Sequence, residues 1–179
     1  MDIEPTQPTI RGLRDAGELE PLSKLDAEIF GDLAYPYFAL RQLYDVHHRD
    51  LLVLELDARL IGYSLLVANR GEDVGWYLAL GVENMHRGHG YGRRLAIESL
   101  RRLELQGVTK VRLTVEPDNT AAIRLYESLG FRGDRVEKNY LGTGRSRVLK
   151  ERLAKQAPGP ASGIGPAEDR FRFARAGTR

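Results

Sequence analysis

The stretch "RGHGYG", from Arg87 to Gly92, decides how this sequence is interpreted. It follows an apolar run, "WYLALGV" (76–82), and precedes a run with helical periodicity, "RRLAIESLRRLELQG" (93–107). The N-terminus of a helix carries unpaired backbone N–H groups and partial positive charge, so it binds phosphate when the backbone can come close. Glycines at alternate positions permit that approach. The stretch therefore predicts a pyrophosphate cradle, and the alternative is a glycine-rich turn without a ligand.

Two familiar phosphate loops are excluded by spacing. The dinucleotide fingerprint GxGxxG requires its third glycine at position 93, which is Arg93. The P-loop requires a Lys followed by Ser or Thr, and that pair is absent. The cradle is therefore of another kind.

Hydrophobic periodicity on either side of the cradle predicts alternating strands and helices. Strands are expected at Thr9–Leu13, 51–57, 59–68, 75–82, 108–116, 131–141 and 146–153, with a tight turn, "DAR", between the second and the third. Helices are expected at Glu18–Ile29, through Phe38, Leu43 and Val46, at Tyr91–Gln106 and at 119–130. This order predicts an α/β layered domain with a mixed sheet and a right-handed parallel crossover in its centre.

Composition limits the classes of function. At 179 residues with 42% hydrophobic content, the chain supports one well-buried core. Its 27 Lys and Arg against 25 Asp and Glu leave a net charge of +2, so we expect no nucleic-acid or membrane partner. The chain has no Cys, its 4 His lack helical ligand spacing, and no run approaches the roughly 18 apolar residues of a membrane span. These features predict a soluble cytoplasmic protein without a metal site.

The composition changes near the end of the chain. Residues 1–155 are predicted to form the domain, and 156–179 a Pro-, Gly- and Arg-rich tail that is flexible. The alternative is that "RFRFARAGTR" (170–179) docks on an acidic partner or on the chain's own surface. A nucleic-acid role would rest on this tail alone.

Two motifs carry a resemblance to a known family. Arg87–Gly92 resembles the Arg/Gln-x-x-Gly-x-Gly/Ala signature of the GNAT superfamily of N-acetyltransferases, and "LALGV" (78–82) resembles its splayed fourth strand. One strand later, "NTAAIRLYESLGF" (119–131) is similar to the second hallmark, Asn-x-x-A-x-x-x-Tyr-x-x-x-Gly-Phe. The resemblance covers about residues 9–153. It implies a mixed, mostly antiparallel sheet that is splayed between the fourth and fifth strands and flanked by helices.

The resemblance also implies acetyl-CoA as co-substrate and direct attack of an amine on its thioester. Tyr126 would protonate the leaving thiolate, and a backbone N–H near Leu80–Val82 would stabilise the oxyanion. Asn119 would contact the pantetheine arm or act as an ordinary helix N-cap. The residues implied in coenzyme binding are Leu80, Gly81, Val82, Arg87, Gly88, His89, Gly90, Tyr91, Gly92, Asn119 and Tyr126.

Within the superfamily, the segments 29–43 and 136–153 resemble those of protein N-terminal α-acetyltransferases, including the ribosomal-protein alanine type. This resemblance implies acceptor contacts from Phe30, Tyr35, Tyr37 and Tyr140. In those relatives a Glu or His that acts as general base occupies the position of Thr114, and threonine cannot take that role. Glu116 and Tyr77 are therefore the candidates for the general base in this chain.

The absence of a strong base bears on the acceptor. An α-amine of pKa about 7.8 is roughly one tenth free at pH 7, whereas a lysine amine of pKa about 10.4 is below about one thousandth free. A site with a weak base therefore suits an N-terminal amine, or a small-molecule amine of similarly low pKa, better than a lysine. The leading hypothesis is a peptide or protein N-terminus as acceptor. The alternatives are a small-molecule amine, such as an antibiotic, a polyamine or an amino acid, and a non-catalytic acyl-CoA-binding module. The resemblance also admits a homodimer.

Overall fold

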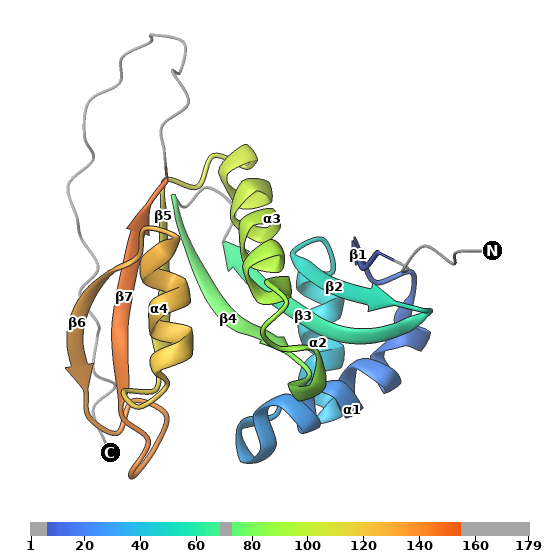
Figure 1. Ribbon diagram of the computed structural model, residues 1–179, viewed down its shortest axis with the longest axis horizontal. Helices are drawn as coiled ribbons and strands as arrows, with labels where there is room; N and C mark the ends of the chain where they lie inside the picture. Colours follow the sequence, from blue (N-terminus) through green and yellow to red (C-terminus); the bar gives the residue numbers. More distant parts are fainter. Residues whose placement is uncertain (1–6, 69–72, 155–179) are drawn as a thin grey trace, which may run out of the picture.

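The computed structural model describes residues 7–68 and 73–154, which form one mixed α/β unit (Figure 1). Its seven-stranded sheet has the order β1-β2-β3-β4-β5-β7-β6, with β4 and β5 parallel and every other neighbouring pair antiparallel. The strands are β1 (Thr9–Gly12), β2 (Leu51–Leu56), β3 (Arg59–Ala68), β4 (Val74–Val82), β5 (Lys110–Val115), β6 (Arg132–Glu137) and β7 (Arg147–Leu153). The helices are α1 (Leu19–Phe30), α2 (Tyr37–His47), α3 (Tyr91–Leu105) and α4 (Thr120–Ser128), with short 3-10 turns η1 (Ala16–Glu18), η2 (Gly31–Leu33) and η3 (Asn84–His86). The mixed, mostly antiparallel sheet confirms the prediction from the sequence.

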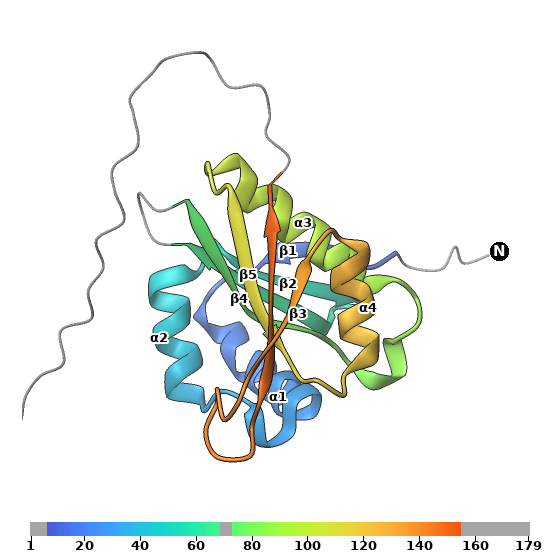
Figure 2. The same ribbon diagram turned by 90° about the vertical axis from the view of Figure 1, so that its left-hand side faces the viewer.

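The helices form two layers, one on each face of the sheet. Figure 2 shows α1 and α2 on one side and α3 and α4 on the other. Leu19, Leu22 and Leu25 are buried at helical spacing and turn α1 toward the core, as the periodicity predicts. On the opposite face, Leu100 and Leu103 of α3 share one apolar cluster with residues of α4, β5 and β7. The two faces of the sheet can therefore be told apart by which helices cover them.

The centre of the sheet is splayed, as the resemblance implies. Only Val74–Trp76 of β4 pairs with Lys110–Arg112 of β5, so the rest of β4 has no strand partner on that side among the described residues. The pairing of β4 with β3 also shifts by one residue at Leu78, which is a β-bulge. The two strands separate beyond Trp76 and leave the backbone of Leu80–Val82 facing a gap.

The closing pair of strands is shorter than predicted. β6 ends at Glu137, whereas the sequence predicts a strand to Leu141. Asn139 has φ of 54°, and Gly142 and Gly144 also have positive φ, so the chain turns back before the expected end. Leu141, which lies in this turn, remains exposed. The predicted tail, 156–179, lies outside the described residues.

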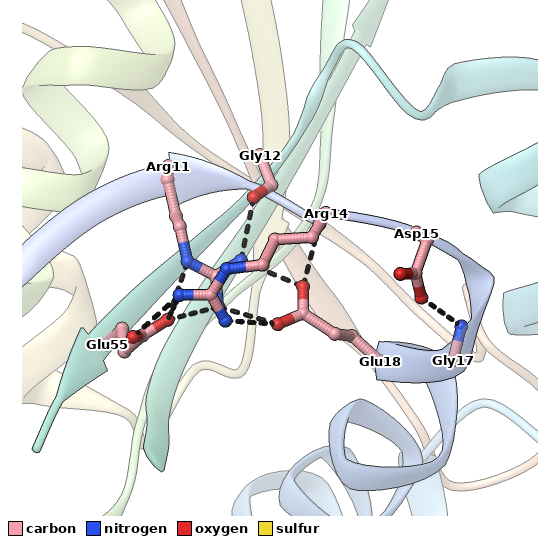
Figure 3. A network of polar contacts seen from close by, with 7 residues as sticks. All are labelled: Arg11, Gly12, Arg14, Asp15, Gly17, Glu18 and Glu55. Atoms are coloured by element: carbon pink, nitrogen blue, oxygen red, sulfur yellow. Dashed lines mark hydrogen bonds and ion pairs between the residues drawn. The ribbon is translucent and has the colours of Figure 1, made fainter. Parts of the chain in front are cut away.

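An arginine between two glutamates joins β1, β2 and η1 (Figure 3). Arg11 donates to both carboxylate oxygens of Glu18, at 2.8 and 2.7 Å, and its Nε donates to Glu55 at 2.6 Å. Arg14 adds a second cation to the same two carboxylates. The hydrogen bonds from Arg11 are the main cause that lowers the pKa of Glu18 to about 2.

The low pKa of Glu18 predicts a dependence of stability on acid. The charged form of Glu18 stabilises the folded state above the unfolded-state pKa of 4.5. This contribution is lost as pH falls toward 2, because the unfolded chain binds the proton more tightly than the folded chain does. We expect Glu18→Gln to lower the free energy of unfolding at pH 7, and this loss to shrink between pH 5 and pH 2. Urea unfolding across this range measures it. Glu20→Gln is the control, since Glu20 is exposed and, in the part of the chain that the structure describes, pairs only with Lys24 at 3.4 Å.

Candidate active site

A cavity of about 820 Å³ opens where β4 and β5 separate. One wall is the free edge of β4 with the loop that enters α3, and another is the start of α4. On the opposite face of the sheet, the end of α1, the turn η2 and the beginning of β7 close it. The cavity is therefore lined by elements from both faces of the sheet.

The loop before α3 has the geometry expected of an anion cradle. Gly88 and Gly90 have φ of 82° and 77°, in the left-handed region that favours glycine. Gly90 is the N-cap of α3 and has no side chain to cap it. The backbone N–H groups of Tyr91, Gly92 and Arg93 donate no hydrogen bond within the described residues. These donors, together with the positive end of α3, are available to phosphate oxygens.

Charged side chains hold this loop in place. Arg87 donates from Nε to the carbonyl oxygen of Val82 at 3.0 Å, which leaves its charge at the cavity wall. Arg93 donates to Ser128 Oγ at 2.6 Å and so ties the first turn of α3 to the end of α4. The buried carboxylate of Glu83 pairs with His86 at 2.9 Å and with Arg59. His89, in contrast, stacks on Tyr91 and does not line the cavity.

The Tyr126 side chain forms part of the cavity wall. Its ring packs between Tyr77 and Phe131, with centroids 6.3 and 5.7 Å away, and the side chain is buried. Its hydroxyl makes no hydrogen bond within residues 7–68 and 73–154, although Tyr126 lines the cavity. Burial raises its pKa, so the hydroxyl stays protonated at neutral pH. The arrangement suits a proton donor.

The hydroxyl of Tyr77 is directed elsewhere. It donates to the backbone oxygen of Ala96 on α3 at 3.5 Å, beside the buried Ser64 and Ser99 hydroxyls, which are 2.7 Å apart. Burial raises the pKa of Tyr77 to about 12. A group that is protonated at neutral pH and already donates to a helix carbonyl is a poor proton acceptor.

Glu116 lies on the face of the sheet opposite Tyr126. Val115 joins the cluster beneath α3 and α4, so its neighbours Thr114 and Glu116 face the side of α1 and α2. Both line the cavity. Asn119, at the start of α4, also lines it, and its Oδ1 accepts from the backbone N–H of Ala122 at 3.1 Å. Asn119 is therefore an N-cap in addition to any contact with a ligand.

The segment after α1 is fixed by a buried aspartate. Asp26 accepts from the Tyr63 hydroxyl and, at 2.6 Å, from the backbone N–H of Tyr35. The Tyr35 hydroxyl donates to the carbonyl oxygen of Leu78, at the bulge of β4, at 3.4 Å. Burial is the main cause that raises the pKa of Asp26, against the two hydrogen bonds that lower it. This anchor holds Tyr35 at the cavity wall.

Not every residue expected at the acceptor side lines the cavity. Phe30 and Tyr35 do, whereas Tyr37 and Tyr140 are exposed and lie outside the lining. The turn after β6 brings Leu141 to the wall in place of Tyr140. Asp32, Leu141 and Arg147 are among the lining residues that the sequence interpretation did not include.

The described residues hold no cluster of three or more His, Asp or Glu side chains suited to a metal. No helix within residues 7–68 and 73–154 combines the length and apolar character needed to cross a membrane.

The site consists of a helix-terminal anion cradle, a free strand edge and a protonated tyrosine around one cavity.

This constellation has the shape and the hydrogen-bond donors suited to an extended phosphate-bearing ligand within a split sheet. The model of the acetyltransferase (GNAT) family matches residues 18–131. The chain belongs to this family, as the two motifs indicate.

Known proteins share parts of the sequence and the whole fold. The mycothiol acetyltransferase of Streptomyces avermitilis is 40% identical over 77 residues, which cover 43% of this chain and 25% of that protein. The chain thus matches a quarter of that relative's length. The structure of the ribosomal-protein-S18-alanine N-acetyltransferase from Escherichia coli superposes with a TM-score of 0.72 at 19% identity, covering 88% of this chain and 100% of that one. That of yncA from Salmonella typhimurium, solved with its cofactor acetyl-CoA, gives 0.68 at 20% identity, covering 88% and 100%.

Proposed function

We propose that this protein is an acetyl-CoA-dependent N-acetyltransferase that modifies a primary amine. The observation that carries the proposal is the pairing of the open anion cradle at Gly88–Gly92 with the free hydroxyl of Tyr126 across one cavity. Acetyl-CoA supplies the activated acetyl group. Its pyrophosphate would lie on the cradle, and its pantetheine arm along the free edge of β4.

The chain's own groups account for each proton and charge in the transfer. As the amine nitrogen bonds to the acetyl carbon, a backbone N–H of Leu80–Val82 would donate to the acetyl oxygen, on which negative charge develops. Tyr126 would give its proton to the departing sulfur as the carbon–sulfur bond breaks. The base that takes the amine proton, directly or through water, is proposed to be Glu116, since Tyr77 donates to Ala96 and has a raised pKa.

For the acceptor we propose the α-amine of a peptide or protein N-terminus. Asp32 and Glu116 place carboxylates at the acceptor side of the cavity, where they favour a cationic amine. A peptide entering past Phe30, Tyr35 and Leu141 would meet mostly apolar walls. A small-molecule amine is the second candidate, because the curated relatives are named mycothiol acetyltransferases.

Release of free coenzyme A from acetyl-CoA tests the proposal. The acceptors to compare are peptides with a free N-terminus, the same peptides with a blocked N-terminus and an internal lysine, and a panel of small amines. Turnover that requires the free N-terminus supports the peptide acceptor. Turnover with small amines alone overturns it in favour of the second candidate, and binding of acetyl-CoA without turnover of any acceptor contradicts the enzymatic role.

The cradle gives a prediction for coenzyme binding. Gly90→Val places a β-branched residue at φ of 77°, which strains the N-cap of α3. We expect the loop to shift and the dissociation constant for coenzyme A to rise by about tenfold to hundredfold. Isothermal titration calorimetry measures it. Gly107→Val is the matched control, because Gly107 has φ of 89° beyond the other end of α3, away from the cavity.

A further inference from the structure

Arg147 is a buried cation in the wall of the cavity. Its side chain is only 6% exposed, yet Arg147 lines the cavity. A guanidinium has five N–H donors and retains its charge at any physiological pH. A charge buried to this degree is costly unless partners satisfy it.

The described residues satisfy little of this guanidinium. Nη1 donates to the backbone oxygen of Ser146 at 3.0 Å. Nη2 lies 3.3 Å from Glu116 Oε1, an ion pair whose glutamate is 52% exposed. Glu137, opposite Arg147 on β6, pairs with Arg135 at 2.7 Å instead. Most of the donors of Arg147 therefore have no hydrogen-bond acceptor among residues 7–68 and 73–154.

Arg147 is on the acceptor side of the sheet. The next residue, Val148, packs into the cluster beneath α3 and α4, and Lys150 pairs with Glu127 of α4. Alternation along β7 therefore turns Arg147 toward the opposite face, where Glu116 also lies. The cations suited to coenzyme phosphates are Arg87, in the loop before α3, and Arg93, in the first turn of α3.

We propose that Arg147 binds a carboxylate that the acceptor carries close to its reactive amine. The fork of a guanidinium matches a carboxylate with two parallel hydrogen bonds. An acceptor with an ammonium beside a carboxylate places its ammonium against Glu116 and its carboxylate against Arg147. Binding then replaces the ion pair between Glu116 and Arg147 with two ion pairs to the acceptor. This inference rests on the proposed function. The carboxylate belongs either to an acidic side chain near a peptide N-terminus or to a free amino acid.

The test compares acceptors that differ only in this charge. Peptides with Glu or Gln at the first or second position, and an amino acid with its amide, are assayed for acetylation with wild type, Arg147→Gln and Arg147→Lys. Wild type is expected to favour the acidic member of one series by about tenfold or more in kcat/KM, and both variants to lose that preference. The series that shows the preference identifies the source of the carboxylate. Arg145→Gln is the matched control, because Arg145 lies two residues away and does not line the cavity.

A binding measurement separates this inference from the proposed function. Affinities of the Glu and Gln peptides, and of the amino acid and its amide, are measured by calorimetry with coenzyme A present, which requires no turnover. Tighter binding of an acidic member to wild type and equal binding of the pair to Arg147→Gln supports the carboxylate site even if no acetylation occurs. Equal affinities for acid and amide in wild type overturn it, including where the enzyme turns over both. Thermal unfolding of each variant shows that it is folded.

Discussion

Tyr126→Phe is expected to lower kcat by about 10²–10⁴-fold, the range over which a positioned proton donor contributes. The substitution removes only a hydroxyl that makes no hydrogen bond within the described residues, and the ring keeps its contacts with Tyr77 and Phe131. Stability and the affinity for coenzyme A should therefore change little. Single-turnover acetyl transfer under saturating acetyl-CoA measures the effect on chemistry directly.

Tyr77→Phe is the matched control for this variant. It removes a hydroxyl from the neighbouring ring, whose hydrogen bond goes to Ala96 at 3.5 Å. We expect kcat to change by less than about threefold, since a neutral hydrogen bond contributes only about 1 kcal/mol to folding and none of it to the reaction. A larger fall in Tyr77→Phe than in Tyr126→Phe would reverse the proposed roles of the two tyrosines.

Asp26→Ala is expected to lower the free energy of unfolding by about 3 kcal/mol or more. The change leaves the buried Tyr63 hydroxyl and the partly buried Tyr35 N–H without the carboxylate that accepts from both. A buried unsatisfied donor costs about 1–3 kcal/mol. Urea unfolding monitored by circular dichroism measures the loss. Because the same bond holds Tyr35 at the cavity wall, the KM for the acceptor should rise while the affinity for coenzyme A is unchanged.

Asp26→Asn separates hydrogen bonding from charge. The amide oxygen can accept from the Tyr35 N–H, and the amide nitrogen can donate to the Tyr63 oxygen, so only the Tyr63 O–H proton loses its acceptor. Burial raises the pKa of Asp26, which means that the charged form is held unfavourably, and the neutral amide avoids this cost. We expect Asp26→Asn to remain within about 1 kcal/mol of wild type. If both variants lose the same stability, charge rather than hydrogen bonding dominates at this position.

Much of the fold could be predicted because its signals are local. The glycines of 88–92, the Asn119 N-cap and the apolar spacing of α1 and α3 each act within one or two turns of chain. The end of β6 could not be predicted, because "VEKNYL" suits a strand, and the turn depends on Asn139 taking a positive φ. Local patterns do not specify where such a turn occurs when the competing conformation is also favourable.

The cavity wall was harder to predict than the fold. Arg147 becomes part of the cavity because β7 inserts between β5 and β6, which places it beside Glu116 from a distant part of the chain. Tyr77 sits on the predicted strand, but the direction of its hydroxyl depends on α3 packing over it. Such positions depend on which strands become neighbours in the sheet, and no local sequence pattern indicates this.

The unpaired edge of β4 has one more consequence. Unpaired strand edges usually lie at the border of a sheet, where they invite pairing with other chains and aggregation. In this protein the free edge of Leu80–Val82 lies in the middle of the sheet, between β3 and β5, with helices on both faces (Figure 2). A whole foreign strand has no access along its length, whereas a narrow flexible molecule does. The fold thus keeps backbone donors open for a ligand while shielding them from self-association.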